Sequence, residues 1–289
     1  MVPLVIGGLA ALWGVSEYSD AKDNLRSAKN INSQAAAIAE EAKKEVDEIH
    51  KKMLNSLNTV GATKKKIMIG DFKDFSDMIV KIRKNYKFNN DTEGLRELDR
   101  FGINDKLINQ MQDISQQAIN LSNMPNEPDG PSGVGVLGII GAGVFTSAAV
   151  VIAPLYLMMK SDEAKAALYE AKTRMDQAKY YQETCKNIGV LFKAIDVRSR
   201  QINYLLNELN VYFEPAVRTL REISIRRNYS FTGASKEEKI PIFYAHQLGE
   251  TIKKIIDKPI IQNDWSINPD IEHSIELVET NVKMIRSAN

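Results

Sequence analysis

A run of twenty-seven residues without a charged side chain, Gly133 to Met159, constrains the fold of this chain more than any other feature. About 18 or more consecutive apolar residues can cross the roughly 30 Å hydrocarbon core of a bilayer as one helix. A core helix seldom needs so many, and a large exposed apolar surface normally marks a partner or a membrane. The run therefore predicts a segment that interacts with a membrane. The alternative is a central helix or hairpin that is wholly buried by its neighbours.

The N-terminus carries a second uncharged stretch, from Met1 to Ser16. It has neither the basic start nor the cleavage site of a secretory signal, so no cleaved signal peptide is predicted. Sixteen helical residues reach about 24 Å, which is short of a full span. The stretch is expected to be an anchor, a re-entrant piece or a strip that covers the central segment. The side chains expected to contact lipid are large apolar ones of both segments: Val134, Val136, Leu137, Ile139, Ile140, Val144, Phe145, Val150, Val151, Ile152, Leu155, Leu4, Val5, Ile6, Leu9, Leu12 and Trp13.

The conformation of the central segment stays open between strand and helix. β-Branched residues are frequent in it, and Gly141 with Gly143 could form the turn of a hairpin. Gly138, Ala142 and Thr146 instead form a small-residue ridge at helical spacing, which suits helix packing in lipid. The sequence is compatible with a single span and with a folded-back tongue or hairpin.

Most of the remaining chain has helical periodicity. Small or apolar residues recur three or four positions apart from Ala21 to Val60, and again from Ala164 to Phe213. This spacing is typical of long helices that pair through one apolar face. Pro215 is expected to end or kink the second of them. Shorter helices are expected at Asp71–Lys84, Asn104–Asn123, Glu237–Asp257 (after a capping box of Ser235 and Glu238) and from Asn268-Pro269 to about Ile285, with a loop at Asn89–Gly94.

These elements predict an all-α fold, an elongated bundle of long coiled-coil-like helices with a central apolar tongue or hairpin. Both long helices follow an uncharged segment, so they should start at the same apolar end and run parallel. Pairing of their apolar faces then favours the tongue over a single span. The expected parts are an apolar N-terminal segment (1–16), a helical stalk with return helices (17–123), a proline-rich linker (124–132), the membrane-interacting tongue (133–159), and a second long helix with C-terminal helices (160–289).

Signals for catalysis or metal binding are weak. Gly133, Gly135 and Gly138 match a dinucleotide-binding pattern, but they lie in an apolar run that follows a proline-rich linker rather than a strand. The three histidines lack the paired spacing of a zinc site. The single cysteine, Cys185, excludes an intramolecular disulfide and is expected to be a small buried hydrophobe. We therefore expect no enzymatic activity, no metal and no cofactor.

The charge balance gives no reason to expect nucleic acid as a partner. Lys and Arg number 38 against 37 Asp and Glu, for a net charge of +1. The densest basic run is Lys64-Lys65-Lys66. Three consecutive lysines are more often a solvated helix face than a phosphate site, and a solvated face is expected here.

The tail of the chain has a particular pattern of residues: Phe231, Glu237, Glu238, Lys239, Leu248, Ile252, Ile256, Asp257, Lys258, Pro259 and Ile260. With this tail, the order of the segments resembles a family of uncharacterised bacterial helical membrane-associated proteins, for which no function is implied. In layout the chain is also similar to helical pore-forming toxins of the cytolysin A and haemolysin BL type, which hold an apolar tongue between long helices and release it at a membrane.

Two functions follow as hypotheses. The first is a membrane-inserting helical effector of the pore-forming type, which perturbs a bilayer through residues 133–159, as an oligomer. The second is a membrane-anchored helical scaffold that presents a coiled-coil surface to a protein partner and opens no pore. The expected partners are a lipid membrane and either further copies of the chain or another helical protein. The expected location is at a membrane, after synthesis in the cytoplasm.

Overall fold

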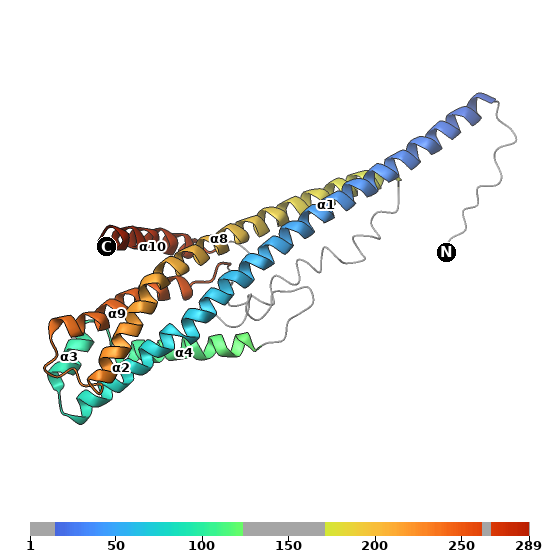
Figure 1. The fold of residues 1–289 in the computed structure, drawn as a ribbon. Helices are drawn as coiled ribbons and strands as arrows, with labels where there is room; N and C mark the ends of the chain where they lie inside the picture. The colour runs from blue at the N-terminus through green and yellow to red at the C-terminus, as the bar shows by residue number, and fades with distance from the viewer. Residues whose placement is uncertain (1–14, 124–170, 262–266, 289) are drawn as a thin grey trace. The chain divides into compact units, whose positions relative to one another are not determined.

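The computed structural model describes residues 15–123, 171–261 and 267–288. Within these ranges the regular elements are helices, and the only extended pairing is an isolated bridge between Ile261 and Ile267. The predicted all-α class is therefore confirmed, whereas the tongue lies outside the described residues. The helices are α1 (Val15–Ile69), α2 (Asp71–Phe88), α3 (Thr92–Arg100), α4 (Asp105–Ser122), α8 (Ala171–Arg226), α9 (Lys236–Ile256) and α10 (Pro269–Ala288) (Figure 1).

The chain divides into two compact units. The first combines the described residues of Met1–Ile49 with those of Leu157–Val190, and the second combines those of His50–Tyr156 with those of Leu191–Asn289. Helices α1 and α8 each contribute residues to both units.

In the second unit, α1 and α8 lie side by side and run in the same direction (Figure 1). Ser56 Oγ donates a hydrogen bond to Asp196 Oδ1 at 2.5 Å. One heptad further along both helices, Thr63 Oγ1 donates to Asn203 Oδ1 at 2.6 Å. Both pairs are 140 positions apart in the sequence, so the two helices keep a constant register. The predicted parallel arrangement is confirmed for this unit.

The apolar stripes predicted from the sequence form the core of the second unit. Along α1 the buried residues recur at alternating intervals of four and three, and along α8 they do the same. This is the spacing that keeps one helix face against a parallel partner. The buried residues of the two predicted stripes in this unit are Met53, Leu57 and Val60 on α1, and Phe192, Ile195, Ile202, Leu205, Leu209 and Phe213 on α8. Ile67 on α1 and Leu206 on α8 are buried in addition.

The first unit has a core of small side chains. Ala35, Ala39, Ala42 and Val46 are buried on α1, and Ala178, Cys185 and Ile188 are buried on α8. Small residues allow helix backbones to approach closely, as the alanine-rich stripe predicts. Burial raises the pKa of the Cys185 thiol, which fits the expected role of a small hydrophobe.

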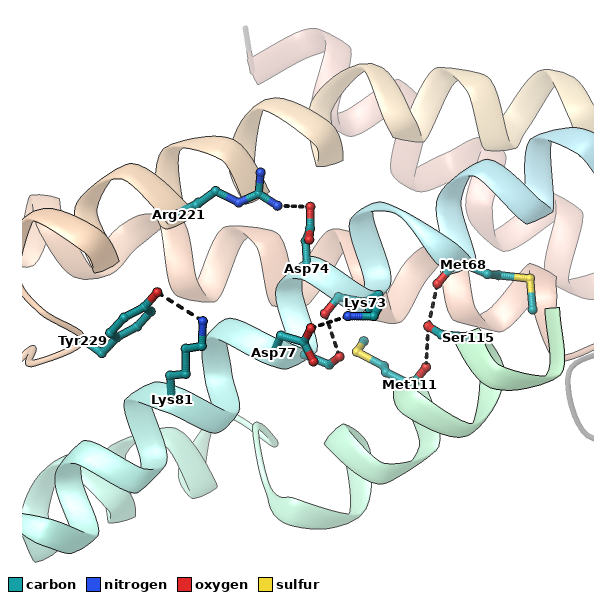
Figure 2. Close-up of polar contacts among 10 residues, drawn as sticks. Met68, Lys73, Asp74, Asp77, Lys81, Met111, Ser115, Arg221 and Tyr229 are labelled. Atoms are coloured by element: carbon teal, nitrogen blue, oxygen red, sulfur yellow. Dashed lines mark hydrogen bonds and ion pairs between the residues drawn. The ribbon is translucent and has the colours of Figure 1, made fainter. Parts of the chain in front are cut away.

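The second unit also contains the shorter helices. Ser115 Oγ on α4 lies 2.5 Å from the Met68 carbonyl oxygen and 3.0 Å from that of Met111, and so connects α4 to the end of α1 (Figure 2). On the other side of α2, Arg221 of α8 forms an ion pair with Asp74. The close-up in Figure 2 shows both connections around the first turns of α2.

Two helix starts agree with the capping patterns in the sequence. The Ser235 side chain accepts a hydrogen bond from the Glu238 backbone, and the Glu238 side chain accepts one from the Ser235 backbone, which completes the predicted capping box of α9. Asn268 Oδ1 accepts from the Asp270 amide at 3.0 Å, directly before Pro269 as the first residue of α10. Both motifs satisfy amides that a helix leaves without an internal acceptor.

Two predictions of local structure are wrong in part. Helix α8 does not end at Pro215 but continues to Arg226, whereas a kink at Pro215 stays a prediction. The hydrogen bond that proline removes belongs to the carbonyl of Val211, a residue on the exposed face, where water can replace the donor. The expected loop at Asn89–Gly94 is also too long, because α3 begins at Thr92, with Asp91 Oδ1 accepting from the Gly94 amide at 2.8 Å.

Gly70 separates α1 from α2 at a point where the backbone approaches itself closely. A Cβ atom at this position would lie 2.7 Å from the Lys66 carbonyl oxygen, a backbone atom with little freedom to move. We expect Gly70→Ala to lower the free energy of unfolding by about 1–3 kcal/mol, measured by urea denaturation followed by circular dichroism.

Gly189→Ala provides the matched control. Its added Cβ would meet only Ile49 Cδ1, at 3.3 Å, the end of a flexible side chain. Since alanine is favoured over glycine inside a helix by about 1 kcal/mol, this variant should be neutral or more stable. Equal losses in both variants would contradict the close approach at Gly70.

Candidate functional site: buried polar groups between α1 and α8

The side chains predicted to contact lipid all lie outside the described residues, because they belong to residues 4–13 and 134–155. In the part of the chain that the structure does describe, none of the helices combines the length and apolar character that a membrane span needs. Among the described residues, the best candidates for a functional site are the polar groups buried on the two long helices of the second unit.

Lys64 is the most unusual of these groups. Its side chain is fully enclosed on α1, with a residue exposure of 1%. The prediction that Lys64-Lys65-Lys66 forms a solvated face is therefore wrong for Lys64. It is right for Lys66, whose exposed ammonium lies 3.3 Å from Glu214. The reason is the helical period, which turns the first lysine of the run toward the core and the third toward water.

The sequence did contain a signal for this burial. The stripe Met53, Leu57, Val60 advances by four and three, and its continuation falls on Lys64 and Ile67. Extrapolating the period places a lysine at a core position between two apolar ones. The charge of the side chain hid that signal, because lysine is rarely buried.

Burial changes the acid–base chemistry of Lys64. Removal from water disfavours the ammonium and lowers the pKa of Lys64 to about 7, although the carboxylate of Asp257 partly counteracts this. Asp257 is the C-cap residue of α9 and also pairs with Lys253. Lys64 thus changes protonation near neutral pH inside the core of the second unit.

Asp196 gives the interface a second buried polar group. It accepts the hydrogen bond from Ser56 across the helix pair and forms an ion pair with Arg200 on its own helix. With Thr63 and Asn203, these groups pair at only one register of α1 against α8. Buried polar residues in coiled coils set the register and the choice of partner, at a cost in stability. The two polar pairs between α1 and α8 are of this kind.

Arg83, a buried arginine on α2, forms a separate cluster that no pattern in the sequence indicates. Its guanidinium donates to Asp99 at 2.7 Å, to Asp105 at 2.9 Å and to the carbonyl oxygen of Ile103 at 3.0 Å. The three acceptors lie on or between α3 and α4, so Arg83 holds this turn against α2. Both carboxylates are more than half exposed, and the cluster has the character of a structural clamp.

The histidines do not form a site. His50 lies in the core with its ring centroid 5.1 Å from that of Phe192. Burial lowers the pKa of His246, which also has a hydrogen bond to the backbone of Phe101. His273 lies on α10, a third helix. Over the described ranges, no three His, Cys, Asp or Glu residues come close enough to hold a metal ion.

The chain was compared with known families, curated proteins and solved structures. No family model, no curated protein and no solved structure matches it. The resemblances in segment order and layout therefore stay predictions.

Proposed function

We propose that this chain acts on membranes, as a helical effector of the pore-forming type that inserts residues 133–159 into a bilayer and perturbs it as an oligomer. The observation that supports this most is the parallel direction of α1 and α8. In the sequence each helix is preceded by an uncharged segment, and parallel helices present their N-terminal ends in the same direction. Two apolar segments would then act at one end of the helix pair.

Both the apolar segment and the helix pair contribute to the energetics of insertion. Transfer of apolar surface into lipid contributes about 25 cal/mol per Å², so a segment of this length supplies a large driving force for insertion. The fixed register of α1 and α8 would hold the segment that precedes α8 in place before insertion. A buried Lys64, whose ammonium prefers water, lowers the cost of separating the helices at neutral and acidic pH.

Dye release from liposomes tests the proposal. We expect the wild-type chain to release an encapsulated dye, and Ile140→Lys and Val151→Lys to reduce the release at least tenfold, since a lysine at the bilayer centre costs about 3 kcal/mol. Phe88→Lys is the matched control, because Phe88 is 86% exposed at the end of α2. It should retain the wild-type release.

Two other outcomes would reject the pore-forming function. Flotation with liposomes without leakage at any concentration would identify a membrane-anchored scaffold instead. A chain that neither floats nor releases dye would exclude both membrane functions and leave a bundle with a buried centre.

A further inference from the structure

His246 joins α9 to the turn between α3 and α4. It forms a hydrogen bond with the backbone of Phe101, and a Cβ atom added to Gly102 would lie 3.5 Å from His246 Nε2. Gly102 has a φ of 81°, a backbone conformation that residues with a Cβ atom rarely adopt. The turn that connects α3 to α4 therefore brings its backbone against the imidazole.

The second ring nitrogen of His246 has no such contact. The residue is 7% exposed, and Nδ1 is buried without a hydrogen-bond partner in the part of the chain that the structure describes. With Nε2 at the turn, this arrangement fits a neutral imidazole that carries its proton on Nε2 and a lone pair on Nδ1. Protonation of Nδ1 would enclose a positive charge and an N–H donor that has no acceptor there, which is unfavourable.

The charges near His246 compensate for this only in part. Burial lowers the pKa of His246, and the carboxylate of Glu250, one turn further along α9, partly opposes the shift. The charged groups of the surrounding helices have other partners: Arg83 of α2 pairs with Asp99 and Asp105, Glu97 of α3 with Lys239, and Arg227 of α8 with Glu238.

The turn is held more firmly on α2 than on α9. On the α9 side, the ring centroids of Phe101 and Phe243 lie 4.1 Å apart, and Glu97 forms an ion pair with Lys239. Phe101 is 48% exposed and the ion pair is partly exposed, and such pairs contribute about 1 kcal/mol or less. On the α2 side, Arg83 donates hydrogen bonds to three groups of α3, α4 and the turn. The contact with α9 should therefore open first.

We propose that His246 is an acid-sensitive switch: protonation of its Nδ1 releases the α3–α4 turn from α9, while the rest of the second unit stays folded. Opening lets water reach the imidazolium, so the open form binds the proton more tightly than the closed form. Acidification therefore shifts the population toward the open form. The inference goes beyond the proposed function, because this opening requires no membrane.

Hydrogen–deuterium exchange of the full chain in lipid-free buffer tests the proposal. Protection factors, corrected for the intrinsic exchange rate, are compared at about pH 7.5 and about pH 5, on either side of the ordinary histidine pKa of about 6.5. The Gly102 and Ile103 amides donate within the turn to Asp99 and Leu98. We expect their protection to fall about threefold or more at the lower pH, while the amides of α4 around Ser115 keep theirs.

His246→Gln should remove this pH response. The glutamine amide retains an N–H donor for the backbone of Phe101 but does not titrate. His273→Gln is the matched control, because His273 is an exposed histidine of α10, and it should respond as the wild type does. Circular dichroism establishes that each variant is folded.

Three results would overturn the proposal. Equal protection of the turn at both pH values would show that His246 is protonated without opening. A loss that persists in His246→Gln would assign the response to another group. A simultaneous loss around Ser115 would show that the unit unfolds as a whole, with no local opening.

Glu250→Gln provides a second measurement that leaves the imidazole in place. The carboxylate of Glu250 favours the charged imidazole in the closed form, and it is exposed. Its replacement should therefore enlarge the loss of protection at the Gly102 and Ile103 amides about twofold. An unchanged or smaller loss would reject His246 as the titrating group.

Discussion

Phe213→Ala is expected to lower the free energy of unfolding by about 3–5 kcal/mol, the usual loss for a fully buried phenylalanine. Phe213 is 0% exposed on α8. Its ring centroid lies 5.6 Å from that of Phe72 and 6.5 Å from that of Phe75, both on α2. Phe213 also lies close to α9, because a Cβ atom added to Gly249 would stand 3.4 Å from Phe213 Cε2. One truncation therefore removes the contact that joins three helices.

Urea denaturation followed by circular dichroism measures this loss, with Phe88→Ala as the control. Phe88 is 86% exposed, and its truncation should change the stability by less than about 0.5 kcal/mol. If Phe213→Ala costs no more than the control, α8 does not pack on α2 and α9 as described.

The buried faces of the long helices could be predicted from the sequence, but their register could not. The periodicity predicts which face of α1 and α8 is buried, because apolar side chains must leave water wherever the helices run. It does not contain the offset between the helices. That offset depends on pairs such as Ser56 with Asp196 and Thr63 with Asn203, which are visible only when both partners are in place.

Short elements were harder to predict than long ones. Helix α9 has a complete capping box and could be placed within one residue at each end. Helix α3 has nine residues, only two of them buried, Gly94 and Leu98, and so shows almost no apolar period. Its start depends on one side-chain cap from Asp91, a signal that also occurs in turns.

At Lys64 the helical period and the residue type lead to different predictions. Lys64 occupies the position that the period of α1 assigns to the core, but its charge predicts a surface. The structure follows the period, because enclosing one ammonium costs less than turning the apolar residues around it toward water. The predicted lipid-contacting residues lie outside the described ranges, and only the liposome experiment tests them.

The cost of enclosing Lys64 should appear as a dependence of stability on pH. In the unfolded chain the lysine keeps its proton up to a pKa of about 10.5, whereas in the folded chain burial lowers its pKa to about 7. Between these values the unfolded state binds more protons, so the free energy of unfolding rises with pH. The penalty is fully present below pH 7. From pH 7 to 9 we expect a rise of about 2 kcal/mol from this residue.

Lys64→Met should abolish that rise, and Lys65→Met should not. Lys65 is the adjacent, partly exposed lysine, so its replacement removes the same charge from a site that reaches water. From pH 7 to 9 the shift of Lys64 has a larger effect than those of the other groups, and the comparison with Lys64→Met cancels what the others contribute. Burial lowers the pKa of His246 from 6.5, which affects stability at lower pH. Burial raises the pKa of Cys185 from 9.0 and those of Tyr86 and Tyr181 from 10.0, and their ionisation in the unfolded chain lowers stability as the pH approaches and passes these values.

Urea denaturation at half-unit intervals of pH measures both variants against the wild type. A wild-type stability that stays flat from pH 7 to 9 would show that Lys64 keeps an ordinary pKa and therefore reaches water. A rise that persists in Lys64→Met would assign the pH dependence to another group. The expected result, a rise that only Lys64 produces, would mean that acidification lowers the stability of the fold in which α1 and α8 pair. A less stable fold would ease any separation of these helices as the apolar segments enter a membrane.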